Sequence, residues 1–137
     1  MAPPPPSRHL AVKPRSLKLL EDIGVACDHI VETMAGLSLS QYVANYHLRN
    51  DIERELTRLG EAAMLLLKED PSYATRISRA SNIVGMRHRL VRGYDHVDDE
   101  ILWETACDHI PRLRREVAAL TEEQLSRIPR PDAGSRS

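Results

Sequence analysis

Apolar residues recur every three or four positions along most of the chain, which is the spacing of one face of an α-helix. The pattern predicts a first helix from about Ser16, which serves as its N-cap, to Ala35, and Gly36 ends it. The apolar face of this helix consists of Leu20, Ile23, Cys27, Ile30, Val31 and Met34.

A second long helix is predicted to end near Asp70, because Pro71 follows. A short helical turn that begins at Ser38 or Ser40 is expected to merge into this helix. Its apolar positions are Leu48, Ile52, Leu56, Leu59, Ala63, Leu66 and Leu67.

Two further helices complete the predicted domain. The third runs from about Thr75 to Arg92 and has Ile77, Ala80, Val84 and Val91 facing inward. The fourth begins near the N-cap Asp98, and its core face is Leu102, Ala106, Ile110, Leu113, Val117 and Leu120. Pro111 must kink or divide this helix, because proline lacks the backbone N–H that a helix interior uses. Four amphipathic helices with short links predict an all-α, antiparallel up-and-down bundle.

Composition agrees with a helical domain that lies between two tails. Aromatic residues make up only 4% of the chain, and there is no Phe, whereas sheets favour aromatic and β-branched residues. Five of the nine prolines lie in residues 1–15, and residues 126–137 mix Pro, Gly, Ser and Arg. Both ends are therefore expected to be disordered, and residues 16–125 are expected to form the helical domain.

Length, charge and cysteine content narrow the class of protein. A chain of 137 residues is the size of one domain, and its net charge of −1 argues against a general polycationic coat for nucleic acid. The two cysteines lie 80 residues apart and do not indicate a disulfide framework. No apolar run approaches the roughly 20 residues of a membrane span, and the start lacks a secretory signal. We expect a cytoplasmic protein without a membrane segment.

The near-neutral total hides a sharp local division of charge. Residues 71–94 contain five arginines and no acid, whereas residues 95–109 contain six acids and no Lys or Arg. Two interpretations remain open and are compatible. Two antiparallel helices could exchange surface ion pairs, each of which contributes little to stability. Alternatively, the arginines could form an edge suited to phosphate.

The pentapeptide Ala-Cys-Asp-His-Ile occurs twice, at 26–30 and 106–110, and offers two cysteines and two histidines. A Cys2His2 zinc site is nevertheless disfavoured, because residues i and i+2 lie about 200° apart around a helix. Cys27 and His29 therefore cannot face one ion, and the same holds for Cys107 and His109 unless Pro111 unwinds that turn. We expect no metal and no cofactor.

A cluster of cationic or titratable side chains stands at the end of the third helix: Arg87, His88, Arg89 and Arg92. Arginine near a helix C-terminus complements the helix dipole, but four such groups exceed that need. Arginine also makes bidentate contacts with phosphate. Gly93 is expected to turn the chain and present Tyr94, which offers a hydroxyl group or a stacking face.

The order and spacing of several short segments resemble the HepT toxins of the HEPN superfamily of small all-helical ribonucleases, over roughly residues 16–125. The segments are Leu-Lys-Leu-Leu-Glu-Asp-Ile at 17–23, Gly-Leu-Ser at 36–38, Leu-Gly-Glu-Ala-Ala at 59–63, Asn-Ile-Val-Gly-Met-Arg at 82–87, Gly-Tyr-Asp at 93–95, Val-Asp at 97–98, Glu-Ile-Leu-Trp at 100–103 and Ile-Pro-Arg-Leu at 110–113.

The resemblance implies a motif of Arg, four residues, His, one residue and Tyr, in which Arg87 and Tyr94 match and Arg92 holds the position of the His. In the family, the Arg and His of two protomers meet at a dimer interface and cleave RNA without metal. The His moves the proton of a 2′-hydroxyl while the Arg stabilises the charged phosphorane. An arginine keeps its proton at any working pH, so this chain is expected to be inactive while still binding phosphate. His88 lies on roughly the same helical face as Arg92, but we do not expect it to serve as the base in place of the family histidine.

The resemblance also implies a partner, an MntA-like nucleotidyltransferase antitoxin that transfers AMP from ATP to Tyr94. The added phosphate would lie against Arg87 and block RNA. Arg92 is either an inactivating substitution or the residue of a natural noncatalytic member. Two other functions remain open at this point. One is a noncatalytic helical dimer that binds a nucleotidyltransferase partner or a nucleotide, and the other is a structural dimer without a ligand.

Overall fold

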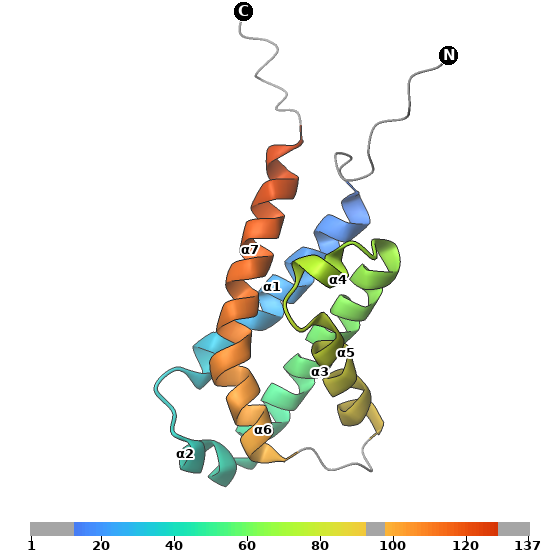
Figure 1. Cartoon of the computed structure of the whole chain (residues 1–137). Helices are drawn as coiled ribbons and strands as arrows, with labels where there is room; N and C mark the ends of the chain where they lie inside the picture. The colour runs from blue at the N-terminus through green and yellow to red at the C-terminus, as the bar shows by residue number, and fades with distance from the viewer. Residues whose placement is uncertain (1–12, 93–97, 129–137) are drawn as a thin grey trace, which may run out of the picture.

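The computed structural model describes residues 13–92 and 98–128, and this part of the chain contains helices and no strand. Four long segments alternate in direction (Figure 1): α1 (Pro14–Met34), α3 (Tyr46–Glu69), α5 (Ala80–Arg92) and a final segment that ends in α7 (Ile110–Ser126). The start of α1 and the end of α7 lie at the same end of the bundle. The predicted all-α, antiparallel bundle is therefore confirmed. Of the predicted tails 1–15 and 126–137, Pro14, Arg15 and Ser126 belong to helices, whereas residues 1–12 and 129–137, like Tyr94, lie outside the described residues.

The core forms where the apolar faces of the long helices meet. Helix α1 packs against α3 and α7, and α3 also packs against α5. The predicted core positions of α7 and of the segment before it are all buried, from Leu102 to Leu120. Val91 was predicted to face inward but is 54% exposed, because it lies in the last turn of α5 next to the helix end.

The first helix begins two residues earlier than the predicted N-cap. Lys13 is the capping residue and Pro14 occupies the first turn, where the missing N–H of proline costs nothing. Ser16 is therefore not a cap but a buried residue inside the helix. The predicted end is confirmed, since α1 stops at Met34 and Gly36 takes a φ of 74°.

The short helix α2 (Leu39–Ala44) does not merge into α3 as predicted. Ser38 caps α2 through a capping box, in which its hydroxyl accepts the amide of Gln41 and its own amide donates to the Gln41 side chain. The Asn45 side chain then accepts the amide of Leu48 and starts α3 as a separate helix. This second N-cap interrupts the helix that the apolar spacing alone would continue.

The predicted helix from Thr75 to Arg92 is divided into α4 (Tyr73–Arg76) and α5. The chain turns between them because Tyr73 and Ile77 both enter the core. Arg79 takes a φ of 57°, and its carbonyl accepts the amides of Asn82 and Ile83 at the start of α5.

The last long segment consists of α6 (Asp99–Glu104), the π-helix η1 (Thr105–His109) and α7. Asp98 is the N-cap as predicted, and its carboxylate accepts the Glu100 amide at 2.7 Å. The predicted break before Pro111 takes the form of the π-helical turn, in which the Ile110 amide donates to the Thr105 carbonyl. None of the helices in the described part of the chain is both long enough and apolar enough to span a membrane.

Candidate functional site

The predicted basic cluster occupies the last turns of α5, and the helix separates its members onto different faces. Arg87 faces α3 and is half-buried, whereas His88 and Arg92 are exposed. Arg89 lines a cavity beside the helix. Arg87 and Arg92 are five residues apart, which places them about 140° apart around an α-helix. One copy of α5 therefore does not present both arginines on the same face.

Gly60 in α3 sets how closely Arg87 approaches the core. A Cβ atom at Gly60 would lie 3.0 Å from Cγ of Arg87 and 3.1 Å from the Ile83 carbonyl oxygen, and closer still to Cβ of Arg87. The two helices therefore meet backbone to backbone at this point. In the sequence, Gly60 stands out only as part of the segment at 59–63. The detectable signal was a glycine inside an otherwise strong helix, where it costs about 1 kcal/mol relative to alanine.

The close approach leaves the Arg87 guanidinium with unused hydrogen-bonding capacity. Its Nε is buried and has no hydrogen-bond partner among the described residues. Its Nη1 lies 3.2 Å from Nδ1 of His88, and because a guanidinium can only donate, Nδ1 is the acceptor. No described carboxylate forms an ion pair with Arg87 in residues 13–92 and 98–128. The packing therefore holds the Arg87 guanidinium in place and leaves N–H donors of this group available to an anion.

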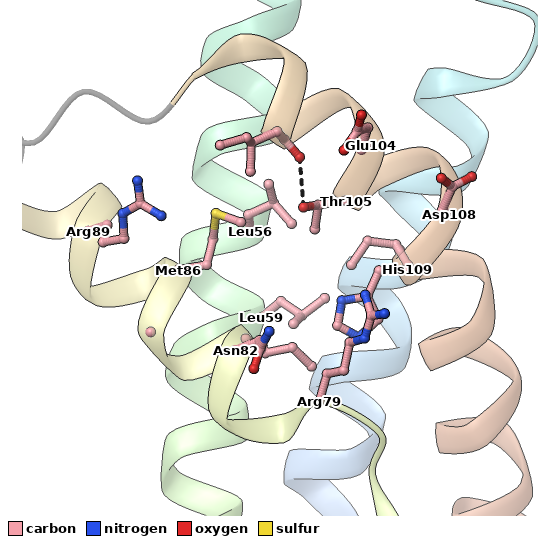
Figure 2. Close-up of a pocket in the computed structure, with 14 residues that line it drawn as sticks. Leu56, Leu59, Arg79, Asn82, Met86, Arg89, Glu104, Thr105, Asp108 and His109 are labelled. Carbon is pink, nitrogen blue, oxygen red and sulfur yellow. Dashed lines mark hydrogen bonds between the residues drawn. The ribbon is translucent and has the colours of Figure 1, made fainter.

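A cavity of about 440 Å³ lies between α5 and the segment formed by α6 and η1, with α3 as its floor (Figure 2). Leu56 and Leu59 of α3 are buried beneath it. The α5 side carries Arg89, and the opposite side carries Glu104 and Asp108. The basic and acidic segments of the sequence thus face each other across the cavity.

Ion pairs of the basic and acidic segments are made with other helices. Arg76, in the basic segment, pairs with Glu123 of α7 at 2.6 Å, and Asp99, in the acidic segment, lies 3.9 Å from Arg49 of α3. Arg76 and Asp99 therefore pair with residues of α7 and α3 and not with each other's segment. Arg89, by contrast, lines one wall of the cavity.

His109 lies at one end of the cavity, in the π-helical turn. Its Nε2 is 3.4 Å from the carbonyl oxygen of Ser78, and Figure 2 places its ring beside the Arg79 side chain. Burial lowers the pKa of His109, and the positive charges of Arg79 and Arg112 lower it further, against the opposing effects of Ser78 and Glu116. The pKa shift therefore favours the uncharged imidazole in the fold.

The repeated pentapeptides do not assemble a Cys2His2 site in the described part of the chain. Cys27 is fully buried, and burial raises the pKa of its thiol to about 12. His29 points away to the surface, where its Nε2 lies 2.9 Å from Asp51, and this hydrogen bond raises the pKa of His29. Within the described ranges, the one group with metal-ligand spacing is His29, Asp51 and Glu55. In this structure these side chains form ion pairs, since Arg58 also contacts Glu55.

Comparison with known proteins identifies the family of this chain. Residues 23–120 match the family described as Ribonuclease HepT-like. The chain belongs to the HepT-like ribonuclease family. A protein of Caldanaerobacter subterraneus subsp. tengcongensis named "Putative RNase" is 30% identical over 77% of this chain and 93% of its own length.

More distant relatives of the HepT-like chain carry the same name. Two proteins of Methanocaldococcus jannaschii, each named "Putative RNase", are 26% identical over 76% of this chain, covering 85% and 89% of their own lengths. No solved structure matches the chain at a significant level.

Proposed function

We propose that this HepT-like chain is the toxin of a toxin–antitoxin system, built as a metal-independent RNA endonuclease whose phosphate-binding residue is Arg87. The observation that carries the proposal is the Arg87 guanidinium. Gly60 lets it approach α3 closely, its Nε has no described partner, and no described carboxylate neutralises its charge. A guanidinium held in this way can bind the scissile phosphate and stabilise the negative charge that develops on it.

The proposed site is completed by a second copy of the chain. Arg87 and Arg92 lie on different faces of α5, so one copy supplies too few groups on one face for a ribonuclease site. A homodimer that brings two copies of α5 together would place Arg87 of one protomer opposite position 92 of the other. The exposed Val91, between these positions, offers apolar surface for such a contact.

The proposed reaction requires a base that this chain lacks. Cleavage begins when a base removes the proton of the 2′-hydroxyl, whose oxygen attacks the adjacent phosphorus and displaces the 5′-oxygen of the next nucleotide. A histidine at position 92 would perform this step, and Arg92 cannot, because a guanidinium has no lone pair to accept a proton. His88 does not replace it in this structure, since its Nδ1 accepts from Arg87.

We further propose that an MntA-like nucleotidyltransferase antitoxin neutralises the toxin by AMPylation of Tyr94. The phenol oxygen attacks the α-phosphorus of ATP, pyrophosphate leaves, and the phenol proton is released. Tyr94 follows the last residue of α5 by two positions, so the added phosphate would lie close to the basic cluster. Its negative charge would then compete with RNA for Arg87.

An RNA cleavage assay on Arg92→His tests the ribonuclease proposal. General-base catalysis contributes about 10²–10⁴-fold, so this variant should cleave RNA faster than the parent by that factor, without added metal. Adding Arg87→Ala should abolish the gain, whereas Arg115→Ala, which removes an exposed arginine of α7, should not. Circular dichroism and sedimentation would establish that each variant folds and assembles like the parent.

The second candidate function is a noncatalytic helical dimer that binds a nucleotidyltransferase partner or a nucleotide. Arg92 at the position of the family histidine favours it, because an arginine retains phosphate binding and removes the base. A well-folded Arg92→His variant that is as inert as the parent would contradict the ribonuclease proposal and support this one.

A further inference from the structure

The proposed cleavage chemistry does not use the cavity between α5 and the α6–η1 segment, which is lined by Met86 and Arg89 but not by Arg87. Its volume of about 440 Å³ is within the roughly 300–1,000 Å³ typical of small-molecule sites. Its floor is apolar, formed by the buried Leu56, Leu59 and Ile83, with Met86 at the side. An apolar floor with a charged rim suits a flat ring system that carries polar edges.

The rim of the cavity has two chemically different walls. Arg79, just before α5, and Asn82 and Arg89 on α5 offer hydrogen-bond donors to phosphate (Figure 2). Glu104 and Asp108 come from α6 and η1 and are both exposed. An ionised carboxylate only accepts hydrogen bonds, so this wall selects a ligand edge that donates them.

Two irregular features of the backbone shape this cavity. Arg79, a non-glycine residue, has a φ of 57°, a left-handed conformation that costs about 1–3 kcal/mol and is concentrated at functional sites. On the other wall, the π-helical turn carries Asp108 and His109, and such turns also occur frequently at functional sites. Both irregular segments contribute lining residues to the same cavity.

We propose that this cavity binds a guanine nucleotide of the RNA substrate, an inference that rests on the proposed ribonuclease function. Guanine presents two adjacent donors, N1–H and the N2 amino group, which one carboxylate can accept together. Uracil offers only one N–H, between two carbonyl acceptors that the carboxylates would repel. Arg89 and Arg79 bind the phosphates that flank the base, and His109 lines the end of the cavity.

Titration of the full chain with GMP, AMP, CMP and UMP, followed by NMR shifts of labelled backbone amides, tests the proposal. GMP should bind tighter than UMP by about 5-fold to 100-fold, the discrimination of one bidentate contact to a base. Amides that line the cavity should shift on binding. The double variant Glu104→Gln with Asp108→Asn should remove the preference for GMP, whereas Glu122→Gln, an exposed control on α7, should keep it. Arg89→Ala should weaken all four nucleotides alike.

The proposal fails if the four nucleotides bind equally, if the shifted amides lie elsewhere, or if the double variant keeps the preference for GMP. It also fails if a second copy of the chain fills the cavity, which would appear as protection of these amides on dimerisation with no effect of GMP. Cleavage by Arg92→His without GMP binding would overturn the guanine pocket alone. GMP binding with an inert Arg92→His variant would overturn the ribonuclease function alone.

Discussion

The contact between Gly60 and Arg87 gives a stability prediction whose sign is unusual for a helical glycine. In a helix interior, replacing glycine by alanine normally stabilises a protein by about 0.5–1 kcal/mol. At Gly60 the added methyl group would meet Cβ and Cγ of Arg87 and the Ile83 carbonyl, with the Cγ contact at 3.0 Å. Carbon atoms prefer roughly 3.5–4.0 Å, and the contact with Cβ of Arg87 is closer than the Cγ contact, so α5 would have to move away from α3 by more than about 1 Å.

The expected result for Gly60→Ala is a net loss of stability. Overpacking of this kind costs about 1–3 kcal/mol, which exceeds the gain in helix propensity and leaves a loss of up to about 2 kcal/mol. For a domain of this size, that loss lowers the melting temperature by up to roughly 10 °C. Because Arg87 moves with α5, the same substitution should also reduce the cleavage that Arg92→His provides.

Thermal and urea unfolding of three single variants would test this reasoning. Gly85→Ala in α5 meets nothing within 4 Å, and at Gly24 the nearest atom is Val117 Cγ1 at 3.9 Å. Both should therefore stabilise the protein by about 0.5–1 kcal/mol, the opposite sign to Gly60→Ala. If Gly60→Ala is as stable as the parent or more so, the close packing of α3 and α5 at Arg87 is refuted.

Three further predictions concern assembly, modification and pH. Sedimentation at micromolar concentration should show a homodimer, and a monomer there would contradict the two-copy site. With ATP and the cognate nucleotidyltransferase, mass spectrometry should show AMP on Tyr94, and Tyr94→Phe should abolish it; modification elsewhere that survives this change would refute the assignment. The fold lowers the pKa of His109, so the folded protein binds a proton at this residue less readily than the unfolded chain does. The stability that the unprotonated His109 provides is therefore present above its unfolded pKa near 6.5 and is lost as pH falls toward the folded pKa. Between pH 7.5 and 5.5, the parent should therefore lose more stability in urea than His109→Gln, and equal losses would contradict the burial of this histidine.

The sequence by itself determined the helical class, the core and several helix ends. Apolar spacing identified positions such as Ile23, Leu56 and Leu113, which are buried, because the period of 3.6 residues is a local property of the helix. Asp98 and Gly36 likewise marked termini through capping and backbone conformation, which depend only on near neighbours in the chain. The sequence also located Arg87 at the end of a helix.

The tertiary structure decided how Arg87 and its surroundings are arranged. Gly60 and Arg87 are distant in the chain, so their close approach depends on how α3 and α5 pack. The division of the third predicted helix at Arg79 follows from the burial of Tyr73 and Ile77, which periodicity does not encode. The cavity lies between α5 and the α6–η1 segment over α3, and Arg89 and Asp108 line it together only because of that packing.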